Sequence, residues 1–587
     1  MRATPVPEVT IEGLAQARAD NAVVIDVRET HEYLAGHVPG VVAVPMGLLP
    51  SRLRELDRTL PVYLICATGN RSAVMAEVLI QAGFDACSVA GGTVEWERAG
   101  RAIETGAPVR AAAHPAEETD RPDWRPLMST ELKIIPIETP TLGDRSYLVH
   151  DGVVAFVIDP QRDIDRVLAL LEEHRVRLTD VFETHIHNDY LTGGLALARR
   201  TGAAYHVNAE DEVSFDRTPI RDQQVVAVGP RMRVTALATP GHTFTHLSYA
   251  LTDTASGAGL DGAVGVFSGG SLLYGATGRP DLLGVDHTDV LVRHQHASAH
   301  KLADLLPDEA EVFPTHGFGS FCSASQSEAT ESTIGQEKAL NPVLTQDEET
   351  YVRELLDGLG AYPAYYAHMS PRNAAGPSEP DLTPPSQADP GELRRRIEAG
   401  EWVVDLRNRT AFAAGHAAGT LNFGLDGSFA TYLGWLITWG TPVTLLGETP
   451  EAIAEAQREL VRIGIDRPAA QATGSPEQWT EEELASFPTA SFADLEQVRR
   501  HREVVILDVR RSEEYDEAAI AGAVSIPIHE LWSRLGDVPA GEVWVHCGAG
   551  YRASVAASML DAVGRRPVAV DDDFENAEKV GLRLVGQ

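Results

Sequence analysis

The chain has 587 residues, of which 43% are hydrophobic and 23% charged, as is usual for soluble globular domains. There are 49 Lys and Arg against 85 Asp and Glu, and the net charge of −36 makes binding to nucleic acid or to an anionic membrane surface unexpected. We see neither a membrane-length apolar run nor a signal-peptide core, so we expect a cytoplasmic protein. Four cysteines cannot form a disulfide framework, and each needs its own explanation.

Residues 5–105 alternate apolar runs with helix-forming segments. VVIDVRETHEYLAGHVPG begins at Val23, and a second apolar run, VYLI, ends just before Cys66. This alternation predicts a parallel sheet with helices on both faces. Cys66 would open a helix with Arg71 behind it, and both features lower the pKa of a thiol. Cys87 falls in a later apolar run, where packing is the expected role. Residues 106–128 mix Pro, Ala and charge, which predicts a linker.

Histidines carry most of the information in residues 129–370. THIHNDYLTGG places His185, His187 and Asp189 at alternating positions after an apolar run, TPGHTFTH adds His242, and PTHGFG adds His316. Imidazole and carboxylate clusters of this kind suit zinc or non-haem iron. The spacing predicts a metal site with His185, His187, His242 and Asp189 as ligands and His316 as a further candidate. For Cys322, near the last motif, packing is the default.

The pattern of the first 105 residues occurs twice more after a proline-rich stretch, residues 371–387, which predicts a second linker. The copies span 388–487, where WVVDLRNRTAFAAGHAAG begins at Trp402, and 488–587, where VVILDVRRSEEYDEAAIAG begins at Val504. The last copy has the loop Cys547-Gly-Ala-Gly-Tyr-Arg552. The middle copy has Gly447 at the cysteine position and no Arg at the matching spacing, so we expect no nucleophile there.

These copies resemble rhodanese domains, sulfurtransferases that carry sulfane sulfur as a cysteine persulfide. The resemblance rests on the two Cys-x-x-Gly-x-Arg loops and on residues shared with the family's other motifs: Asp26, Arg28, Gly36, His37, Gly40, Asp508 and Arg510. It implies that Cys66 and Cys547 are nucleophiles assisted by Arg71 and Arg552. It also implies the residues that bind the transferred sulfur: Gly69, Ser72 and Gly550. Four residues separate each Cys from its Arg, one fewer than in phosphatase loops, which favours a single sulfur atom over a phosphate. In the last copy Ala519 replaces the histidine seen at His37, which we expect to be structural.

Residues 129–370 resemble the metallo-β-lactamase fold, an αβ/βα sandwich. GATGRPDLLG narrows the resemblance to the persulfide dioxygenase branch, in which one Fe(II) oxidises a low-molecular-weight thiol persulfide to sulfite; it implies that Arg279 and Asp281 bind substrate. The sequence departs from the family at Tyr190, where a second-metal histidine is usual, and at Gly270, where the family has an aspartate ligand. Three outcomes stay open: a three-histidine iron site, a replacement carboxylate from Asp189 or Asp281, or no metal at all. Zinc is an alternative to iron.

The favoured hypothesis is therefore a sulfane-sulfur enzyme in which rhodanese-type transfer is coupled to persulfide oxidation at one Fe(II) per chain. Its substrates would be a small thiol persulfide, such as glutathione persulfide, and thiosulfate or sulfite. One alternative is a sulfurtransferase whose metallo-β-lactamase-fold domain holds no metal and acts as a binding scaffold. A thioester hydrolase is less favoured, because Tyr190 and Gly270 remove ligands that a two-metal site would use. The sequence is compatible with a homo-oligomer, and it leaves the thiol carrier open.

Overall fold

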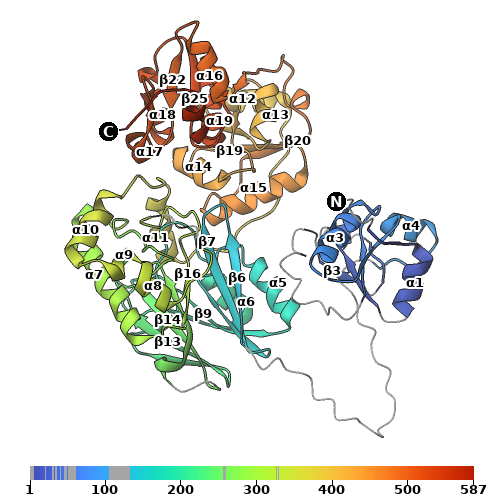
Figure 1. Ribbon diagram of the computed structural model, residues 1–587, viewed down its shortest axis with the longest axis vertical. Coiled ribbons are helices and arrows are strands. Elements are labelled where there is room, and N and C mark those ends of the chain that lie inside the picture. The colour runs from blue at the N-terminus through green and yellow to red at the C-terminus, as the bar shows by residue number, and fades with distance from the viewer. Residues whose placement is uncertain are drawn as a thin grey trace. The chain divides into compact units, whose positions relative to one another are not determined.

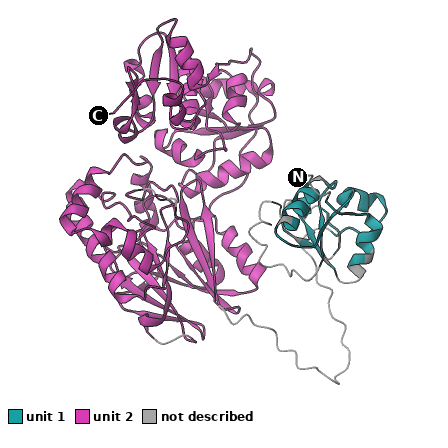
Figure 2. Cartoon of the chain, viewed as in Figure 1, with its two compact units in different colours: residues 1–124 teal, residues 125–587 magenta. Residues whose placement is uncertain are grey.

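The computed structural model describes residues 6–19, 22–28, 32–33, 36–39, 41–44, 46, 49, 61–104, 132–255, 259–325, 327 and 329–586. The chain divides into two compact units, Met1–Trp124 (unit 1) and Arg125–Gln587 (unit 2), shown in teal and magenta in Figure 2. The expected linker over 106–128 and the motif residue Gly40 lie outside the described residues. Among the helices of the described part, none combines the length and apolar character needed to cross a membrane.

Unit 1 contains the predicted parallel sheet, with strand order β1-β5-β4-β2-β3. Its elements are β1 (Glu8–Val9), α1 (Ile11–Ala19), β2 (Val23–Asp26), β3 (Val42–Ala43), β4 (Val62–Ile65), α3 (Asn70–Gln81), β5 (Ala86–Val89) and α4 (Gly92–Arg98). Apolar residues of α3 pack on one side of the sheet with Leu64, and those of α1 and α4 pack on the other with Ile65. The sheet is therefore covered by helices on both faces, as the sequence predicts.

Residues 132–375 of unit 2 form two sheets that pack face to face, as predicted for an αβ/βα sandwich. The first sheet comprises β6 (Lys133–Thr139), β7 (Asp144–His150), β8 (Val154–Ile158), β9 (Arg177–Phe182), β10 (Ala204–Asn208) and β11 (Thr218–Ile220). The second comprises β12 (Val225–Val228), β13 (Met232–Ala238), β14 (Leu247–Asp253), β15 (Ala263–Gly269) and β16 (Glu311–Pro314). Aromatic side chains such as Phe156, Phe182 and Phe267 fill the space between the sheets.

Helices cover the outer face of each sheet (Figure 1). Helices α5 (Asp165–His174) and α6 (Gly194–Thr201) pack on the first sheet, and α7 (Val285–Leu305) packs on the second with α8 (Ile334–Leu340). The remaining helices of this part are α9 (Pro342–Thr345), α10 (Glu348–Asp357) and α11 (Tyr366–Ala375). Because α11 continues to Ala375, the spacer expected over residues 371–387 begins inside a helix, and its irregular part starts at Gly376.

The two remaining copies of the repeat each contain a parallel sheet. The middle copy has α12 (Pro390–Glu398), β17 (Trp402–Asp405), α13 (Arg409–Ala414), β18 (Leu421–Asn422), α14 (Phe429–Leu436), β19 (Val443–Gly447), α15 (Pro450–Arg462) and β20 (Ala470–Thr473). The last copy has β21 (Thr489–Ala490), α16 (Phe492–Arg499), β22 (Val505–Asp508), α17 (Ser512–Glu517), β23 (Ala519–Ile520), β24 (Val524–Ser525), α18 (Ile528–Leu531), β25 (Glu542–His546), α19 (Tyr551–Ala562), β26 (Arg566–Val570), α20 (Glu575–Lys579) and β27 (Leu584–Val585). Their strand orders are β18-β17-β19-β20 and β21-β26-β25-β22-β24, and β23 pairs separately with β27.

The Asp-x-Arg motif has the same structural role in all three copies. In the last copy Arg510 Nε and Nη2 donate to the Asp508 carboxylate at 3.0 and 2.7 Å, and Nη2 also donates to the Ala518 carbonyl oxygen. The pairs formed by Asp26 with Arg28 and by Asp405 with Arg407 match this arrangement. Each buried carboxylate thus fixes the loop that follows its strand, which explains why the motif is present even in the copy without a cysteine.

The metallo-β-lactamase-like part and the two C-terminal copies share one continuous apolar core. That core contains side chains from all three, including Cys322, Leu445 and Cys547. Polar contacts reinforce it: Leu191 N–H donates to the Arg462 carbonyl oxygen at 2.7 Å, and Arg462 Nη2 pairs with Asp163 at 2.8 Å. Unit 2 is therefore held together by both the apolar core and buried ion pairs.

Candidate functional sites

The Cys66 loop follows strand β4 and leads into α3. Gly69 N–H donates to Cys66 Sγ at 3.2 Å, and Ser72 Oγ lies 3.5 Å from the same sulfur. Gly69 has φ +100°, a conformation that glycine adopts without strain, and this lets the chain curl around the sulfur. Burial opposes ionisation of Cys66, but the Ser72 hydroxyl and the surrounding backbone amides outweigh it and lower the pKa of the thiol. The loop therefore favours a sulfur anion.

The Cys547 loop has the same construction between β25 and α19. Gly550, at φ +88°, precedes the first turn of α19, and the Cys547 side chain is buried. A Cβ at Gly550 would lie 2.2 Å from an Asp571 carboxylate oxygen, so the position requires glycine. Arg552 donates through both terminal nitrogens to Glu514, which also accepts from Arg511. Glu514 thus holds Arg552 in a fixed position in the first turn of α19, directly after the Cys547 loop.

A glutamate partner for the loop arginine was missed by sequence reasoning. In unit 1 Arg71 donates to both Glu32 oxygens at 2.6 Å, as Arg552 does to Glu514. Both glutamates lie four residues after the Arg of Asp-x-Arg, so the signal was present in the sequence. The middle copy has Ala411 and Ala452 at the two corresponding positions, so both members of the pair are absent together with the cysteine.

In the middle copy the start of helix α15 differs from the helix starts at the two cysteine loops. Thr449 caps α15, its hydroxyl accepts the Ala452 N–H at 3.3 Å, and Pro450 occupies the first helical position. The N–H groups that would face an anion are therefore capped or missing.

The predicted metal-ligating histidines gather at one edge of the sandwich, because the strands that carry them end there. His185 and His187 follow β9, His242 lies between β13 and β14, and His316 follows β16. All four side chains are buried, and neighbouring ring centroids are 4.1 to 5.9 Å apart. Possible ligand atoms of His185, His187 and His316 lie within 4.8 Å of one another. The structure therefore brings together three of the predicted positions and the further candidate His316.

Each of these imidazoles uses one nitrogen in a hydrogen bond or ion pair directed away from the others. His185 Nδ1 contacts Thr184 Oγ1 at 2.8 Å, and His242 Nδ1 contacts the Arg279 carbonyl oxygen at 2.8 Å. His316 Nδ1 lies 2.9 Å from an Asp144 oxygen. His187 Nε2 lies between three oxygens: Glu183 Oε2 at 3.2 Å, Asp159 Oδ1 at 3.3 Å and Tyr190 OH at 3.1 Å. Histidines that bind metals are usually held in this way.

The opposite nitrogens are the atoms that could bind a cation. His187 Nδ1 and His242 Nε2 are buried without a hydrogen-bond partner, and His185 Nε2 faces His316 Nε2 at 3.5 Å. Buried polar nitrogens without partners are costly, so their presence in one place fits a site for a metal ion. The described residues thus contain a His/Asp cluster suited to a metal.

Three further predicted residues lie beside the histidine cluster. Asp189 Oδ2 lies 3.1 Å from His316 Nδ1, and Asp189 forms a group of possible metal ligands with Asp144 and His316 rather than with His185, His187 or His242. Arg279 and Asp281 form a two-point ion pair, with both distances 2.7 Å, and Arg279 is buried under Tyr362. The Asp281 carboxylate therefore binds Arg279 and not a histidine. Because the Arg279 carbonyl oxygen contacts His242 Nδ1, this ion pair helps to position the segment that holds the His242 ring.

Electrostatics differ among the imidazoles of the cluster, and burial lowers the pKa of His185 and His246. Burial lowers the pKa of His242 to about 3, so this imidazole is neutral. Burial acts in the same direction on His187 and His316, but nearby carboxylates outweigh it and raise their pKa values to about 10 and about 9. These opposing shifts mean that the carboxylates around the cluster stabilise cations inside the protein.

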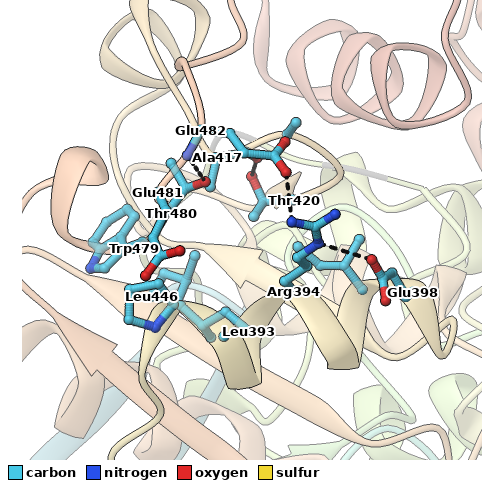
Figure 3. Close-up of a pocket in the computed structure, with 14 residues that line it drawn as sticks. Leu393, Arg394, Glu398, Ala417, Thr420, Leu446, Trp479, Thr480, Glu481 and Glu482 are labelled. Atoms are coloured by element: carbon cyan, nitrogen blue, oxygen red, sulfur yellow. Dashed lines mark hydrogen bonds and ion pairs between the residues drawn. The ribbon is translucent and has the colours of Figure 1, made fainter.

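A cavity of about 220 Å³ lies in the middle copy between α12 and the segment around Trp479 (Figure 3). Leu393, Leu446 and Trp479 line it, and Arg394 at its rim pairs with Glu398 and Glu482 at 3.0 and 2.9 Å. The charged groups at its rim are therefore paired with each other. No cysteine or histidine lines this cavity, in contrast to the cysteine loops and the histidine cluster.

Comparisons with known proteins agree with this division. Residues 10–99 and 491–578 match the rhodanese-like domain family. A sulfurtransferase of Allochromatium vinosum is 32% identical over 101 residues, which cover 94% of that protein and 17% of this chain. The crystal structure of a metallo-β-lactamase from Staphylococcus aureus matches with a TM-score of 0.52 and 27% identity, covering 59% of this chain and 99% of that one. The chain is a rhodanese–metallo-β-lactamase fusion.

The fusion also has a relative on the metallo-β-lactamase side. The human mitochondrial persulfide dioxygenase ETHE1 is 28% identical over 214 residues, covering 36% of this chain and 73% of that protein. The chain spans about half the length of the first curated relatives that it matches. The fusion therefore combines rhodanese sulfurtransferase domains with a domain related to persulfide dioxygenase.

Proposed function

We propose that the fusion is a sulfane-sulfur enzyme in which Cys547 accepts and passes on a single sulfur atom. The observation that carries this proposal is the Cys547 loop, where the thiol lies at the start of α19 beside an arginine fixed by Glu514. Cys66 in unit 1 has the same surroundings and would act in the same way. The positive end of the helix and the arginine stabilise both the thiolate and the persulfide anion.

The transfer step needs no outside oxidant or reductant. The Cys547 thiolate attacks the outer sulfur of thiosulfate, the S–S bond breaks, and sulfite leaves with the electron pair. The enzyme then carries a persulfide anion, Cys547–S–S⁻. An acceptor such as cyanide or a small thiolate attacks the outer sulfur and restores the Cys547 thiolate.

The metallo-β-lactamase-fold domain would receive a low-molecular-weight thiol persulfide. A bound Fe(II) would supply the redox chemistry by which O₂, as the four-electron oxidant, and water convert such a persulfide to sulfite and the free thiol, and the residues that would hold the metal are His185, His187, His242 and His316. Phe321 supports coupling to the rhodanese, because it precedes the buried Cys322 and lies 5.9 Å from the Arg511 guanidinium. Sulfite made in one domain and persulfide held in the other could thus combine to thiosulfate nearby.

The test is the rate of thiocyanate formation from thiosulfate and cyanide by the full chain. We expect Cys547→Ser and Cys66→Ser each to lower the rate and the double variant to abolish it, whereas Cys87→Ser keeps it as the matched control. A double variant with the wild-type rate would refute the sulfurtransferase assignment. Oxygen uptake with glutathione persulfide tests the second activity, and a metal-loaded protein without uptake would leave the metallo-β-lactamase-fold domain as a binding scaffold.

A further inference from the structure

The Cys547 loop lies at the end of a row of aromatic side chains that all three parts of unit 2 supply. Phe321, from the metallo-β-lactamase-fold domain, packs edge to face on Trp435 of α14, with ring centroids 4.9 Å apart. One turn earlier on α14, the Tyr432 ring lies 6.2 Å from Trp435 and 5.8 Å from Tyr551, which belongs to the Cys547 loop. The row therefore runs from the metallo-β-lactamase-fold domain through the middle copy to the loop that holds the nucleophile.

Tyr432 is a neutral group at the Cys547 end of this row. Burial raises the pKa of its phenol, Arg552 opposes that shift, and Cys547 and Glu514 add to it. The phenol therefore lies within electrostatic reach of the Cys547 sulfur and stays protonated near neutral pH, so it does not repel an anion there. The rings of the row also lower the dielectric constant beside the loop, which strengthens an ion pair formed there.

The ion pair between Arg552 and Glu514 lies directly beside the nucleophile. A Cβ at Gly548, the residue after Cys547, would lie 3.1 Å from Arg552 Nη2 and 3.7 Å from Glu514 Oε1. Arg552 donates through both terminal nitrogens to Glu514, at 2.5 and 2.8 Å, and its side chain is 14% exposed. The carboxylate of Glu514 therefore balances the charge of Arg552.

Arg511 is a second cation beside the same pair, and it is less engaged. It reaches Glu514 through Nε at 3.1 Å, and within the described residues its two terminal nitrogens have no hydrogen-bond acceptor. Its side chain is 37% exposed, and its guanidinium lies 5.9 Å from the Phe321 ring. Arg511 is therefore the cation that is free to bind a ligand where the last copy meets the metallo-β-lactamase-fold domain.

From this arrangement we infer that Arg511 binds sulfite as the acceptor of sulfur from the Cys547 persulfide and so sets the acceptor preference of this site. The inference deepens the proposed function and rests on it. The lone pair of the sulfite sulfur attacks the outer sulfur of Cys547–S–S⁻, the S–S bond breaks, and its electron pair returns to Cys547 as the thiolate. Thiosulfate leaves, and no oxidant or reductant is consumed.

Charge explains why this step needs a cation besides Arg552. The persulfide carries one negative charge and sulfite carries two, so three negative charges meet at the reacting sulfur atoms. Arg511 supplies the positive charge that Glu514 does not already balance, and its terminal N–H groups suit a two-point hydrogen bond to an oxyanion. Cyanide carries at most one negative charge and has no oxygen atoms, so its reaction depends much less on Arg511.

The test is a single-turnover experiment on the full chain carrying Cys66→Ser, so that Cys547 is the loop cysteine that reacts. Cys547 is loaded from thiosulfate radiolabelled in its outer sulfur, freed from excess reagent and mixed with sulfite or with cyanide, and labelled thiosulfate or thiocyanate is followed over time. We expect Arg511→Gln to slow transfer to sulfite at least about tenfold, the effect of losing one charged hydrogen bond, and to change transfer to cyanide less than about twofold. Arg511→Lys, which keeps the charge, should recover part of the sulfite rate.

Arg500→Gln is the matched control, because Arg500 belongs to the same copy and pairs with Glu496 of α16 at 2.7 Å. It should leave both transfers unchanged. An arginine that only supported the fold would affect both acceptors alike, so equal losses with sulfite and cyanide would overturn the inference.

Unchanged transfer to sulfite in Arg511→Gln would overturn it as well. Arg511→Met, which is uncharged and of similar length, replaces Arg511→Gln should that variant fail to fold, as judged by circular dichroism. Cyanide separates the inference from the proposed function. If the parent protein takes up no label or forms no thiocyanate, the proposed function is refuted and the inference with it.

Discussion

Replacing Ser72 by alanine should make Cys66 a weaker acid. Cys66 Sγ has two nearby donors, Gly69 N–H at 3.2 Å and Ser72 Oγ at 3.5 Å. A hydrogen bond to a charged group contributes about 1.5–3 kcal/mol. Ser72 has one hydroxyl proton, and the Gly69 carbonyl oxygen at 3.0 Å and Ser88 Oγ at 2.9 Å compete for it. We therefore take the lower end, about 1.5 kcal/mol, which corresponds to about one pKa unit.

The direction of the expected pKa change follows from the pKa of Cys66 in the folded protein. The loop lowers the pKa of Cys66, so its thiolate persists to lower pH than that of an ordinary cysteine. Ser72→Ala should move the midpoint up by about one unit, and at any pH below both midpoints the thiolate fraction should fall about tenfold. The assay is the pH dependence of iodoacetamide alkylation at Cys66, followed by peptide mass spectrometry.

Cys87 is the internal reference for this experiment. Burial, reinforced by Asp85, raises the pKa of Cys87, so Cys66 should be alkylated at lower pH than Cys87 in the same sample. Ser88→Ala gives the opposite test, because it removes a competitor for the Ser72 hydroxyl proton, so the pKa of Cys66 should not rise in this variant. Identical Cys66 profiles in wild type and Ser72→Ala, or a Cys66 midpoint above that of Cys87, would refute the reasoning.

Three further results are expected. Glu514→Gln, measured in a Cys66→Ser background, should lower kcat/KM for thiosulfate at least about tenfold, because it weakens a charged hydrogen bond to Arg552. Arg552 outweighs burial and holds the pKa of Glu514 at about 2, so the pH midpoint of activity should not move. An unchanged rate would contradict the role given to the Arg552–Glu514 pair. Asp405→Asn should lower the free energy of unfolding of unit 2 in urea by about 3 kcal/mol, because it leaves Arg407 buried without its carboxylate, whereas sulfur transfer per folded molecule should stay the same. Removing a metal present at 100 times its Kd should lower the free energy of unfolding of unit 2 by about 2.7 kcal/mol and leave the rate of thiocyanate formation unchanged. A parallel loss of that activity would show that the metal site and the cysteine loops depend on each other.

Much of the architecture could be predicted from local patterns. The alternation of apolar runs and Ala-rich segments predicts the parallel sheets, and the two Cys-x-x-Gly-x-Arg loops lie between strand and helix as expected. These features depend on residues close together in the chain, where periodicity and capping decide the structure.

The outer parts of the metal site could not be predicted in this way. Asp144 and His316 are 172 residues apart, and only the packing of the two sheets brings them together. Asp281 was expected as a spare ligand, but its two-residue separation from Arg279 favours a local ion pair instead. Glu183 immediately precedes the His motif, yet its role depends on how the chain turns back after β9. Spacing identified which residue types gather, and tertiary packing decides which of their atoms face inward.

The middle rhodanese-like copy, which has Gly447 where the other two copies have a cysteine, helps to hold unit 2 together. Its helix α15 carries Arg462, which binds Asp163 at 2.8 Å, and the loop that follows carries Asp466, which binds Arg162 at 2.6 Å. Both partners belong to the metallo-β-lactamase-fold domain. An enzyme engineer who removed this copy as redundant would thus uncover the apolar surfaces of both neighbours. The contacts of this copy therefore give it a part in the assembly of unit 2.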